Sequence, residues 1–174
     1  MEQPRARRAE QLFADNARAV RAYALRRVDP VTADDLVSDV FVVAFRRLEV
    51  IPEPPLPWLL ATARKIIANQ RRADSRRDAL NSELQPLQAG IWHEDHGDDH
   101  ALLAGLARLA DRDREAILLV AWEQLDAASA AAVLGCSRAA FAVRLHRARR
   151  RLAATMAQQQ QLETLSSRPT EVTK

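Results

Sequence analysis

The sequence has little cysteine, glycine, lysine or aromatic content, and these shortages exclude several classes of protein. The single cysteine, Cys136, excludes an internal disulfide and a four-cysteine zinc site. None of the four glycines forms a glycine-rich phosphate loop, so no motif indicates a nucleotide or another cofactor. No apolar run approaches the roughly 20 residues needed to cross a bilayer, so we expect a cytoplasmic protein without a membrane span.

Positive charge is carried almost entirely by arginine and is concentrated near the C-terminus. Lysine occurs only at Lys65 and Lys174. Residues 137–152 contain six arginines and no acidic residue, whereas residues 91–100 contain four acidic residues and no lysine or arginine. Guanidinium groups are suited to bidentate contacts with phosphate or guanine. The cluster therefore indicates a polyanionic partner that binds at one place rather than over the whole surface.

The spacing of apolar residues predicts an all-α fold. Apolar residues recur at helical intervals almost throughout, and no stretch alternates with a period of two. A chain of 174 residues can hold two small helical domains joined by a flexible linker. We expect the first domain over residues 9–73, the linker over 74–100, a helix-turn-helix domain over 101–157 and a disordered tail over 158–174.

Three helices are expected in the first domain. The first spans about Ala9 to Val28, and the second starts at Thr32, with Asp35 placed to satisfy free amides of its first turn. A proline-rich loop at residues 51–57 precedes a third helix from about Trp58 to Arg72. The side chains expected in the core are Leu12, Phe13, Val20, Tyr23 and Ala24 from the first helix, and Leu36, Val37, Val40, Phe41, Ala44, Phe45 and Leu48 from the second.

The third helix combines a polar side with an aromatic residue. A period of 3.6 residues places on this side Trp58, Thr62, Lys65, Asn69 and Arg72. A polar helix side that carries an exposed aromatic residue is unusual. Taken alone, Trp58 would more often belong to the core than to an exposed surface, and both interpretations stay open at this point.

The second domain has the spacing of a helix-turn-helix at Ala131, Gly135 and Phe141. This motif needs a small residue where two helices cross, a glycine with positive φ in the turn, and an apolar side chain that fixes the second helix. An ordinary helical hairpin with a solvated arginine face is the alternative. The expected helices are Ala101–Ala110, Arg112–Gln124, Ala127–Leu134 and Arg138–Gln158, with Asp111, Asp126 and Ser137 as N-caps.

The helix after the turn would be the recognition helix of such a motif. Its N-terminal part would enter the major groove and contact base edges and phosphates. The residues expected to bind DNA there are the cap Ser137, then Arg138, Ala139, Ala142 and Arg144, with Arg147 and Arg149 flanking them.

Three motifs, in order along the chain, resemble conserved stretches of one protein family. Residues 33–41, Ala-Asp-Asp-Leu-Val-Ser-Asp-Val-Phe, resemble its A-E-D-L-x-Q-E-x-F stretch, and residues 58–64 resemble its W-L-x-x-I-A-R stretch. Residues 109–119, the Leu-Gly-Cys-Ser turn and residues 144–149 resemble its fourth conserved region. On these motifs the chain resembles a group 4, or extracytoplasmic-function (ECF), sigma factor of bacterial RNA polymerase, over about Leu12 to Leu152.

The resemblance implies a non-enzymatic promoter-specificity subunit. Its partners would be promoter DNA and core RNA polymerase, bound at a coiled coil of the largest subunit and at the flap, and an anti-sigma factor is a further candidate. The second helix would bind the polymerase through Asp35, Ser38, Asp39, Val42 and Arg46. The third helix would bind the −10 element through Trp58, Thr62, Lys65, Asn69, Arg71 and Arg72, and the helix-turn-helix would bind the −35 element.

Several residues depart from the family pattern. Ser38 stands where glutamine is usual, Thr62 where isoleucine is usual, Lys65 where asparagine is usual and Asn69 where aspartate is usual. In the recognition helix, residues 140–143 read Ala-Phe-Ala-Val where Thr-Val-Lys-Ser is usual. The lost hydroxyl and lysine remove candidate phosphate contacts, so we expect a divergent −10 preference and a weaker −35 contact.

Two other functions are compatible with parts of the sequence. The first is a stand-alone helix-turn-helix regulator whose N-terminal half dimerises or senses a signal. The second is a metal-dependent hydrolase that uses the histidines and carboxylates of residues 93–100, although no general base or substrate pocket supports it. A solvated acidic linker explains residues 93–100 better, and in the ECF sigma factors this connector follows the RNA path of the polymerase. No metal site is therefore expected.

Overall fold

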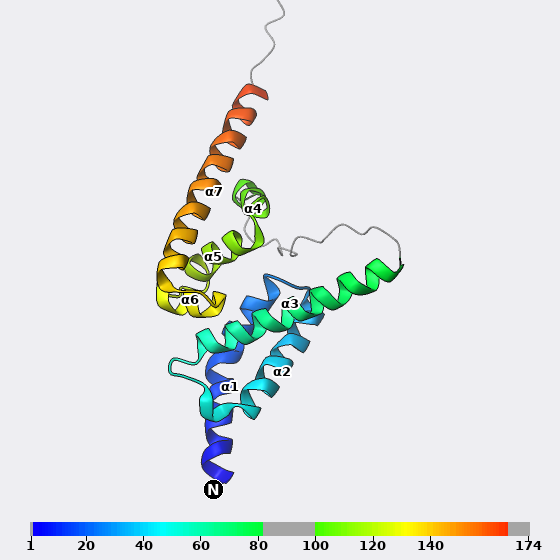
Figure 1. Ribbon diagram of the computed structural model, residues 1–174, viewed down its shortest axis with the longest axis vertical. Helices are drawn as coiled ribbons and strands as arrows, with labels where there is room; N and C mark the ends of the chain where they lie inside the picture. Colours follow the sequence, from blue (N-terminus) through cyan, green and yellow to red (C-terminus); the bar gives the residue numbers. More distant parts are fainter. Residues whose placement is uncertain (1, 82–99, 167–174) are drawn as a thin grey trace, which may run out of the picture.

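A computed structural model describes residues 2–81 and 100–166, and all regular elements in these ranges are helical, as predicted (Figure 1). The first domain consists of α1 (Glu2–Leu25), α2 (Pro30–Arg46), the short 3₁₀ helix η1 (Leu48–Val50) and α3 (Leu56–Asn81). The second consists of α4 (His100–Ala107), α5 (Asp111–Ala121), α6 (Ala127–Leu134) and α7 (Arg138–Ser166). The predicted two-domain, all-α architecture is confirmed.

The core of the first domain lies where α1, α2 and α3 pack together. Its fully buried side chains include Val20, Tyr23, Leu36, Val40, Phe41, Leu59 and Leu60. Burying a large apolar side chain contributes roughly 1.5–3 kcal/mol, so these contacts dominate the stability of the domain. Two of the expected core residues were assigned wrongly, because Phe13 is 46% exposed and Phe45 is 38% exposed. Both lie at the edge of the core, where Phe13 packs edge-on against Phe41 at 4.8 Å between ring centroids.

The second helix begins earlier than predicted. Asp29 is its N-cap, and the Asp29 carboxylate accepts a hydrogen bond from the Thr32 backbone N–H at 3.0 Å. Hydrogen bonds from the Thr32 hydroxyl and N–H lower the pKa of Asp29, because they stabilise its charged form. Pro30 occupies the first helical position, where its missing N–H costs no hydrogen bond. The prediction that Thr32 starts the helix with Asp35 as its capping partner was therefore wrong.

Other helix ends also differ from the prediction. α1 begins at Glu2 and ends at Leu25, rather than spanning Ala9 to Val28. α3 continues to Asn81, so the expected linker start at residue 74 falls inside a helix. α7 continues to Ser166, through most of the expected disordered tail. The rest of the expected linker, residues 82–99, and the last residues, 167–174, lie outside the described part of the chain.

The second domain has a small apolar centre of its own. Leu106, Leu109 and Leu118 are buried together, and Leu152 of α7 packs against them. Gly105 lets α4 approach α7 closely, since a Cβ at this position would lie 2.9 Å from Leu152 Cδ1. Asp111 does not cap α5 as predicted, because Ala110 is the capping residue and makes no side-chain hydrogen bond.

The two domains pack against each other in this structure. α6 lies against α3, and a single apolar cluster includes Leu59 and Ala63 of α3 together with Ala130 of α6 and Phe141 of α7. In the described ranges, no single helix is long and apolar enough to cross a membrane. The helix pair Ala127–Leu134 and Arg138–Gln158 reaches the length and apolar composition of a membrane span only if the two helices are counted together across the 95° bend between them.

Candidate nucleic-acid interface

The turn between α6 and α7 has the chemistry that the sequence predicts. Asp126 caps α6 by accepting hydrogen bonds from the N–H groups of Ser129 and Ala128, which hold its pKa below the usual value. Gly135 has φ 65°, a left-handed conformation that favours glycine. The Ser137 hydroxyl accepts a hydrogen bond from the Ala140 N–H at 3.2 Å and so caps α7. Phe141 is fully buried and fixes α7 against α6.

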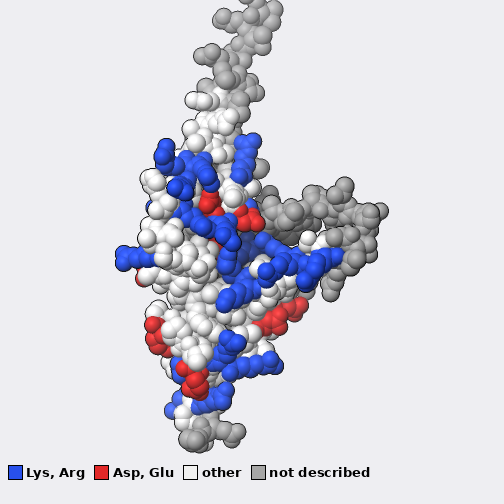
Figure 2. Space-filling view, in the orientation of Figure 1, with Lys and Arg blue, Asp and Glu red and all other residues white. Residues whose placement is uncertain are grey.

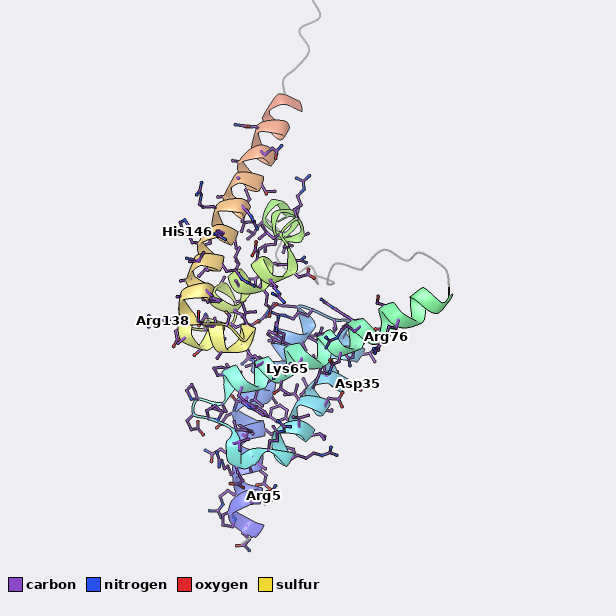
Figure 3. All side chains as sticks on the ribbon, in the orientation of Figure 1. Arg5, Asp35, Lys65, Arg76, Arg138 and His146 are labelled. Atoms are coloured by element: carbon purple, nitrogen blue, oxygen red, sulfur yellow. The ribbon has the colours of Figure 1, made fainter. Side chains whose placement is uncertain are left out.

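The face of α7 that would read DNA is open to solvent. Of the residues predicted to contact the −35 element, Arg144 is half-buried. The others are exposed, namely Ser137, Arg138, Ala139, Ala142, Arg147 and Arg149. Figure 3 shows Arg138 at the start of α7, at the outer edge of the domain. The recognition helix therefore presents its arginines without any rearrangement of the domain.

The polar side of α3 forms a second candidate surface. Lys65, Asn69 and Arg72 are exposed, and Arg72 Nη2 donates to Asn69 Oδ1 at 2.5 Å. Thr62 is half-buried, and its hydroxyl donates to the carbonyl of Trp58 at 3.0 Å, so this proton is used within the helix. Arg71 differs from the others, because its Nη2 donates to the carbonyl of Arg27 in the turn after α1. Its guanidinium group is therefore partly occupied within the protein.

Trp58 is neither a fully buried core residue nor a fully exposed surface residue, the two interpretations that the sequence left open. It is half-buried and packs against the apolar cluster while still contributing to the surface. The prediction of a freely exposed aromatic residue was thus too strong. An indole ring with one side on the core and another side open is held rigidly, which suits stacking against a base.

Arg76 extends the same polar side and was missed by the sequence analysis. It is exposed and lies four residues beyond Arg72, on the part of α3 that was expected to be linker. The spacing Lys65, Asn69, Arg72, Arg76 continues the helical period, so periodicity would have found Arg76 had the helix not been ended at Arg72. Figure 3 shows Lys65 and Arg76 spaced along α3.

Positive charge gathers on one face across both surfaces. Figure 2 shows Lys and Arg over the middle of the molecule, along α3, and above it on α7. The acidic side chains lie in separate patches, one of them just below α3, where Figure 3 places Asp35 on α2. A basic face of this kind attracts a polyanion such as a nucleic acid backbone.

The exposed side of α2 forms a third surface with a different character. All five residues predicted to contact the polymerase are exposed, namely Asp35, Ser38, Asp39, Val42 and Arg46. Within the described ranges, Asp35 and Asp39 have no ion-pair partner, whereas the neighbouring Asp34 pairs with Arg21 at 2.7 Å. The apolar side chains of Val42 and Phe45 lie exposed beside these acids, at 46% and 38%. An acidic and apolar strip suits a protein partner that carries basic residues.

The structure does not test a metal site in the linker. The histidines and carboxylates of residues 93–99 lie outside the described part of the chain. Among the described residues, no group of three or more histidine, cysteine or acidic side chains is arranged to hold a metal ion.

Comparison with known families matches both domains. The family described as Sigma-70 region 2 matches residues 12–77, and the family described as Sigma-70, region 4 matches residues 99–152. The first match covers the helices that carry the α2 and α3 surfaces, and the second covers the helix-turn-helix.

Individual proteins show the same likeness over both domains. The chain is 31% identical over 128 residues to the RNA polymerase sigma-E factor of Streptomyces coelicolor, covering 71% of each protein. It is 30% identical over 153 residues to the ECF RNA polymerase sigma factor SigL of Mycobacterium tuberculosis, covering 83% of this chain and 86% of SigL. Among solved structures, the sigma factor RpoE in complex with the anti-sigma factor NepR from Bartonella quintana superposes with a TM-score of 0.70 at 25% identity, covering 85% of this chain and 96% of RpoE. CnrH, in complex with the cytosolic domain of CnrY, gives 0.57 at 25% identity, covering 88% and 94%.

Proposed function

Because this chain belongs to the ECF sigma factors of the sigma-70 family, we propose that it directs core RNA polymerase to promoters through the three surfaces described above. Sigma factors are non-catalytic initiation factors, and this chain has that role in transcription initiation. The proposed division of labour assigns core polymerase to α2, the −10 element to α3 and the −35 element to α7. The protein would act in the cytoplasm, with the polymerase.

One observation carries this assignment more than any other. A single chain presents a solvent-exposed recognition helix, a second exposed cationic helix with an aromatic residue, and an acidic strip in which Asp35 and Asp39 have no ion-pair partner among the described residues. A stand-alone regulator needs only the recognition helix. The other two surfaces have a use when the protein must also bind a polymerase and hold opened DNA.

We propose that the −35 element is bound through the first turns of α7. The N-terminus of a recognition helix enters the major groove, where Arg138 and Arg144 can reach guanine edges or phosphates. Ala139 and Ala142 are small enough to let the helix lie close to the bases, and Ala142 can contact a thymine methyl group. Arg147 and Arg149, one to two turns further on, would contact flanking phosphates.

At the −10 element, α3 would hold a strand of the opened duplex. Lys65, Arg72 and Arg76 would track the phosphates, while the open side of Trp58 stacks on a base at the edge of the opened region. Asn69 and Thr62 would contribute polar contacts. Arg71 would join only after releasing the carbonyl of Arg27.

A protein that restrains the chain is a further proposed partner. The RpoE and CnrH structures each contain a second protein, an anti-sigma factor in the case of RpoE. The exposed apolar side chains of Phe13, Val42 and Phe45 offer a surface on which such a partner could pack.

Run-off transcription with purified core polymerase tests the function directly. We expect the full chain to co-purify with core polymerase and to start transcripts at defined sites, from which both promoter elements can be read. As a matched control, Asp35→Lys with Asp39→Lys should abolish co-purification, whereas Asp15→Lys with Glu10→Lys, exposed acids on α1, should not. A wild-type chain that neither binds core polymerase nor supports specific starts would refute the proposal.

The role of Arg144 can be isolated through the salt dependence of DNA binding. Arg144→Ala should weaken binding of the polymerase complex to a −35 duplex and reduce the slope of log K against log salt by about one unit, because one fewer counterion is released. Fluorescence anisotropy at several salt concentrations measures this slope. Arg112→Ala, which removes an exposed arginine from α5, is the matched control and should leave the slope unchanged. An unaltered slope for Arg144→Ala would mean that this half-buried side chain serves packing instead.

A further inference from the structure

The outward side of α7 is apolar in its first two turns. Phe141 is buried, and a period of 3.6 residues places on the opposite side of the helix Ala139, Val143 and His146. All three are exposed, Val143 to 50%, and Ala142 is exposed beside them. Figure 3 shows His146 one turn further along α7. Because the N-terminal part of a recognition helix lies closest to the bases, Val143 is the largest side chain at the centre of the reading surface.

The arginines of α7 lie on the two flanks of this surface. By the same period, Arg138 and Arg149 lie toward one flank, and Arg144 and Arg147 toward the other. Long cationic side chains at the edges of a recognition helix reach the phosphates on the two walls of the groove. The charges therefore suit the two backbones, and they leave around Val143 no side chain that donates or accepts a hydrogen bond.

The centre of the reading surface departs from the usual ECF pattern. Ala142 stands where lysine is usual, and Val143 stands where serine is usual. A lysine ammonium donates to guanine or phosphate, and a serine hydroxyl both donates and accepts, so the usual side chains recognise polar base edges. A valine offers only methyl groups. The chemistry by which this chain distinguishes bases must therefore differ at these two positions.

Thymine is the base that presents an apolar group in the major groove. Its C5 methyl group lies at the groove edge of the base pair, whereas guanine, adenine and cytosine present donors and acceptors there. A donor or acceptor that faced Val143 would lose its water without gaining a hydrogen bond, which is unfavourable. A methyl group in the same place would bury apolar surface against the valine, which is favourable.

From this arrangement, and resting on the proposed function, we propose that Val143 is a specificity-determining residue that selects thymine in the −35 element through the C5 methyl group. Ala139 and Ala142 let α7 approach the bases closely enough for this contact, because neither side chain extends beyond Cβ. The flanking arginines supply affinity without sequence preference. The −35 element of this chain is thus defined by where its thymine methyl groups lie.

Replacement of thymine by deoxyuridine tests the contact, because uridine pairs with adenine in the same way but lacks the methyl group. The full chain, in complex with core polymerase, first selects its −35 element from a promoter library randomised over that element. Each thymine of the selected duplex is then replaced in turn, and fluorescence anisotropy gives the two affinities. At the contacted position we expect uridine to bind about fourfold more weakly, the effect of removing one buried methyl group.

The ratio of the thymine and uridine affinities within one variant identifies the residue that contacts the methyl group. In Val143→Ser this ratio should fall to about one, whatever the overall affinity of the variant, because the apolar partner is gone. Val31→Ser is the matched control, since Val31 is 75% exposed at the start of α2, and it should keep the fourfold ratio. If Val143→Ser has lost helix content, Val143→Ala replaces it and should lower the ratio in the same direction.

The outcomes separate this inference from the proposed function. A selected element without thymine, or equal affinities for the thymine and uridine duplexes, would overturn the role of Val143. An unchanged ratio in both Val143 variants would also overturn it, because the methyl group would then act through the shape of the groove. A wild-type chain that binds no core polymerase and selects no promoter would instead refute the proposed function.

Discussion

Replacing Phe141 with alanine is expected to destabilise the helix-turn-helix by about 3–5 kcal/mol and to abolish binding to a −35 duplex. The ring is fully buried between α6 and α7, in the apolar cluster that also contains Leu119 and Ala131. Its removal leaves a cavity, because side chains in a close-packed core cannot shift far enough to fill the space of a phenyl ring. Domains of this size are stable by only about 5–15 kcal/mol, and the loss is a large part of that.

Urea denaturation followed by circular dichroism measures this loss, and anisotropy measures DNA binding. Val143→Ala is the matched control, since it shortens an apolar side chain on the same helix that is 50% exposed. It should change the free energy of unfolding by less than about 0.5 kcal/mol. If Phe141→Ala proved as stable as Val143→Ala, the packing described for the turn between α6 and α7 would be incorrect.

The second large effect is expected at Trp58. Trp58→Ala should reduce formation of the open promoter complex about 10-fold to 100-fold, because stacking of one base on an aromatic ring contributes about 1–3 kcal/mol. Binding of core polymerase should change much less, since the surface proposed for that contact lies on α2. Permanganate footprinting of unpaired thymines measures the opening, and co-purification measures polymerase binding.

The partial burial of Trp58 makes the choice of control important. Trp58→Leu keeps an apolar side chain against the core but removes the aromatic face, whereas Trp58→Phe keeps both in reduced form. Stacking predicts that the leucine variant opens promoters as poorly as alanine while its thermal stability stays near that of the wild type. If leucine restored opening, Trp58 would serve as a core residue.

Features set by neighbouring residues were predictable from the sequence. The bounds of α6, the caps Asp126 and Ser137, the glycine with positive φ and the buried Phe141 are all as expected. Each depends on contacts within a few residues, such as a side chain that accepts from its own helix or a turn that needs a missing Cβ. Local chemistry of this kind is encoded directly in a short stretch of sequence.

Features set by competition between local signals were predicted less well. Thr32 was assigned as a cap, but Asp29 followed by Pro30 is the stronger start, and Thr32 became the donor to it. The length of α3 was underestimated because residues 74–81, a polar stretch, were taken for linker, although two arginines, one alanine and one leucine in it favour a helix. Because of that error, Arg76 was not predicted as part of the polar side of α3.

The hydrogen bonds and ion pairs that join the two domains, from Tyr23, Arg26 and Arg27 to Glu115 and Glu123, could not have been predicted from the sequence. Tyr23 and Glu115 are separated by 92 positions along the chain, and Arg26 and Glu123 by 97. Nothing in the pattern around either residue indicates a partner so distant, and charged residues at helix ends are usually solvated. Only the three-dimensional packing of α6 on α3 brings the two ends together.

The composition of α6 determines how much apolar surface would be exposed to water if the two domains separated. The helix that packs on α3 reads Ala-Ala-Ser-Ala-Ala-Ala-Val-Leu, so the α6 side of this contact is made largely by methyl groups, whereas α3 contributes Leu59 to the same apolar cluster. If α6 were rich in leucine and phenylalanine, separation of the domains would expose a large hydrophobic patch on it, and such patches promote aggregation. The separated face of α6 would present mostly small side chains to water. A separated α6 would therefore add mainly small side chains to the exposed apolar surface, which keeps the driving force for aggregation low.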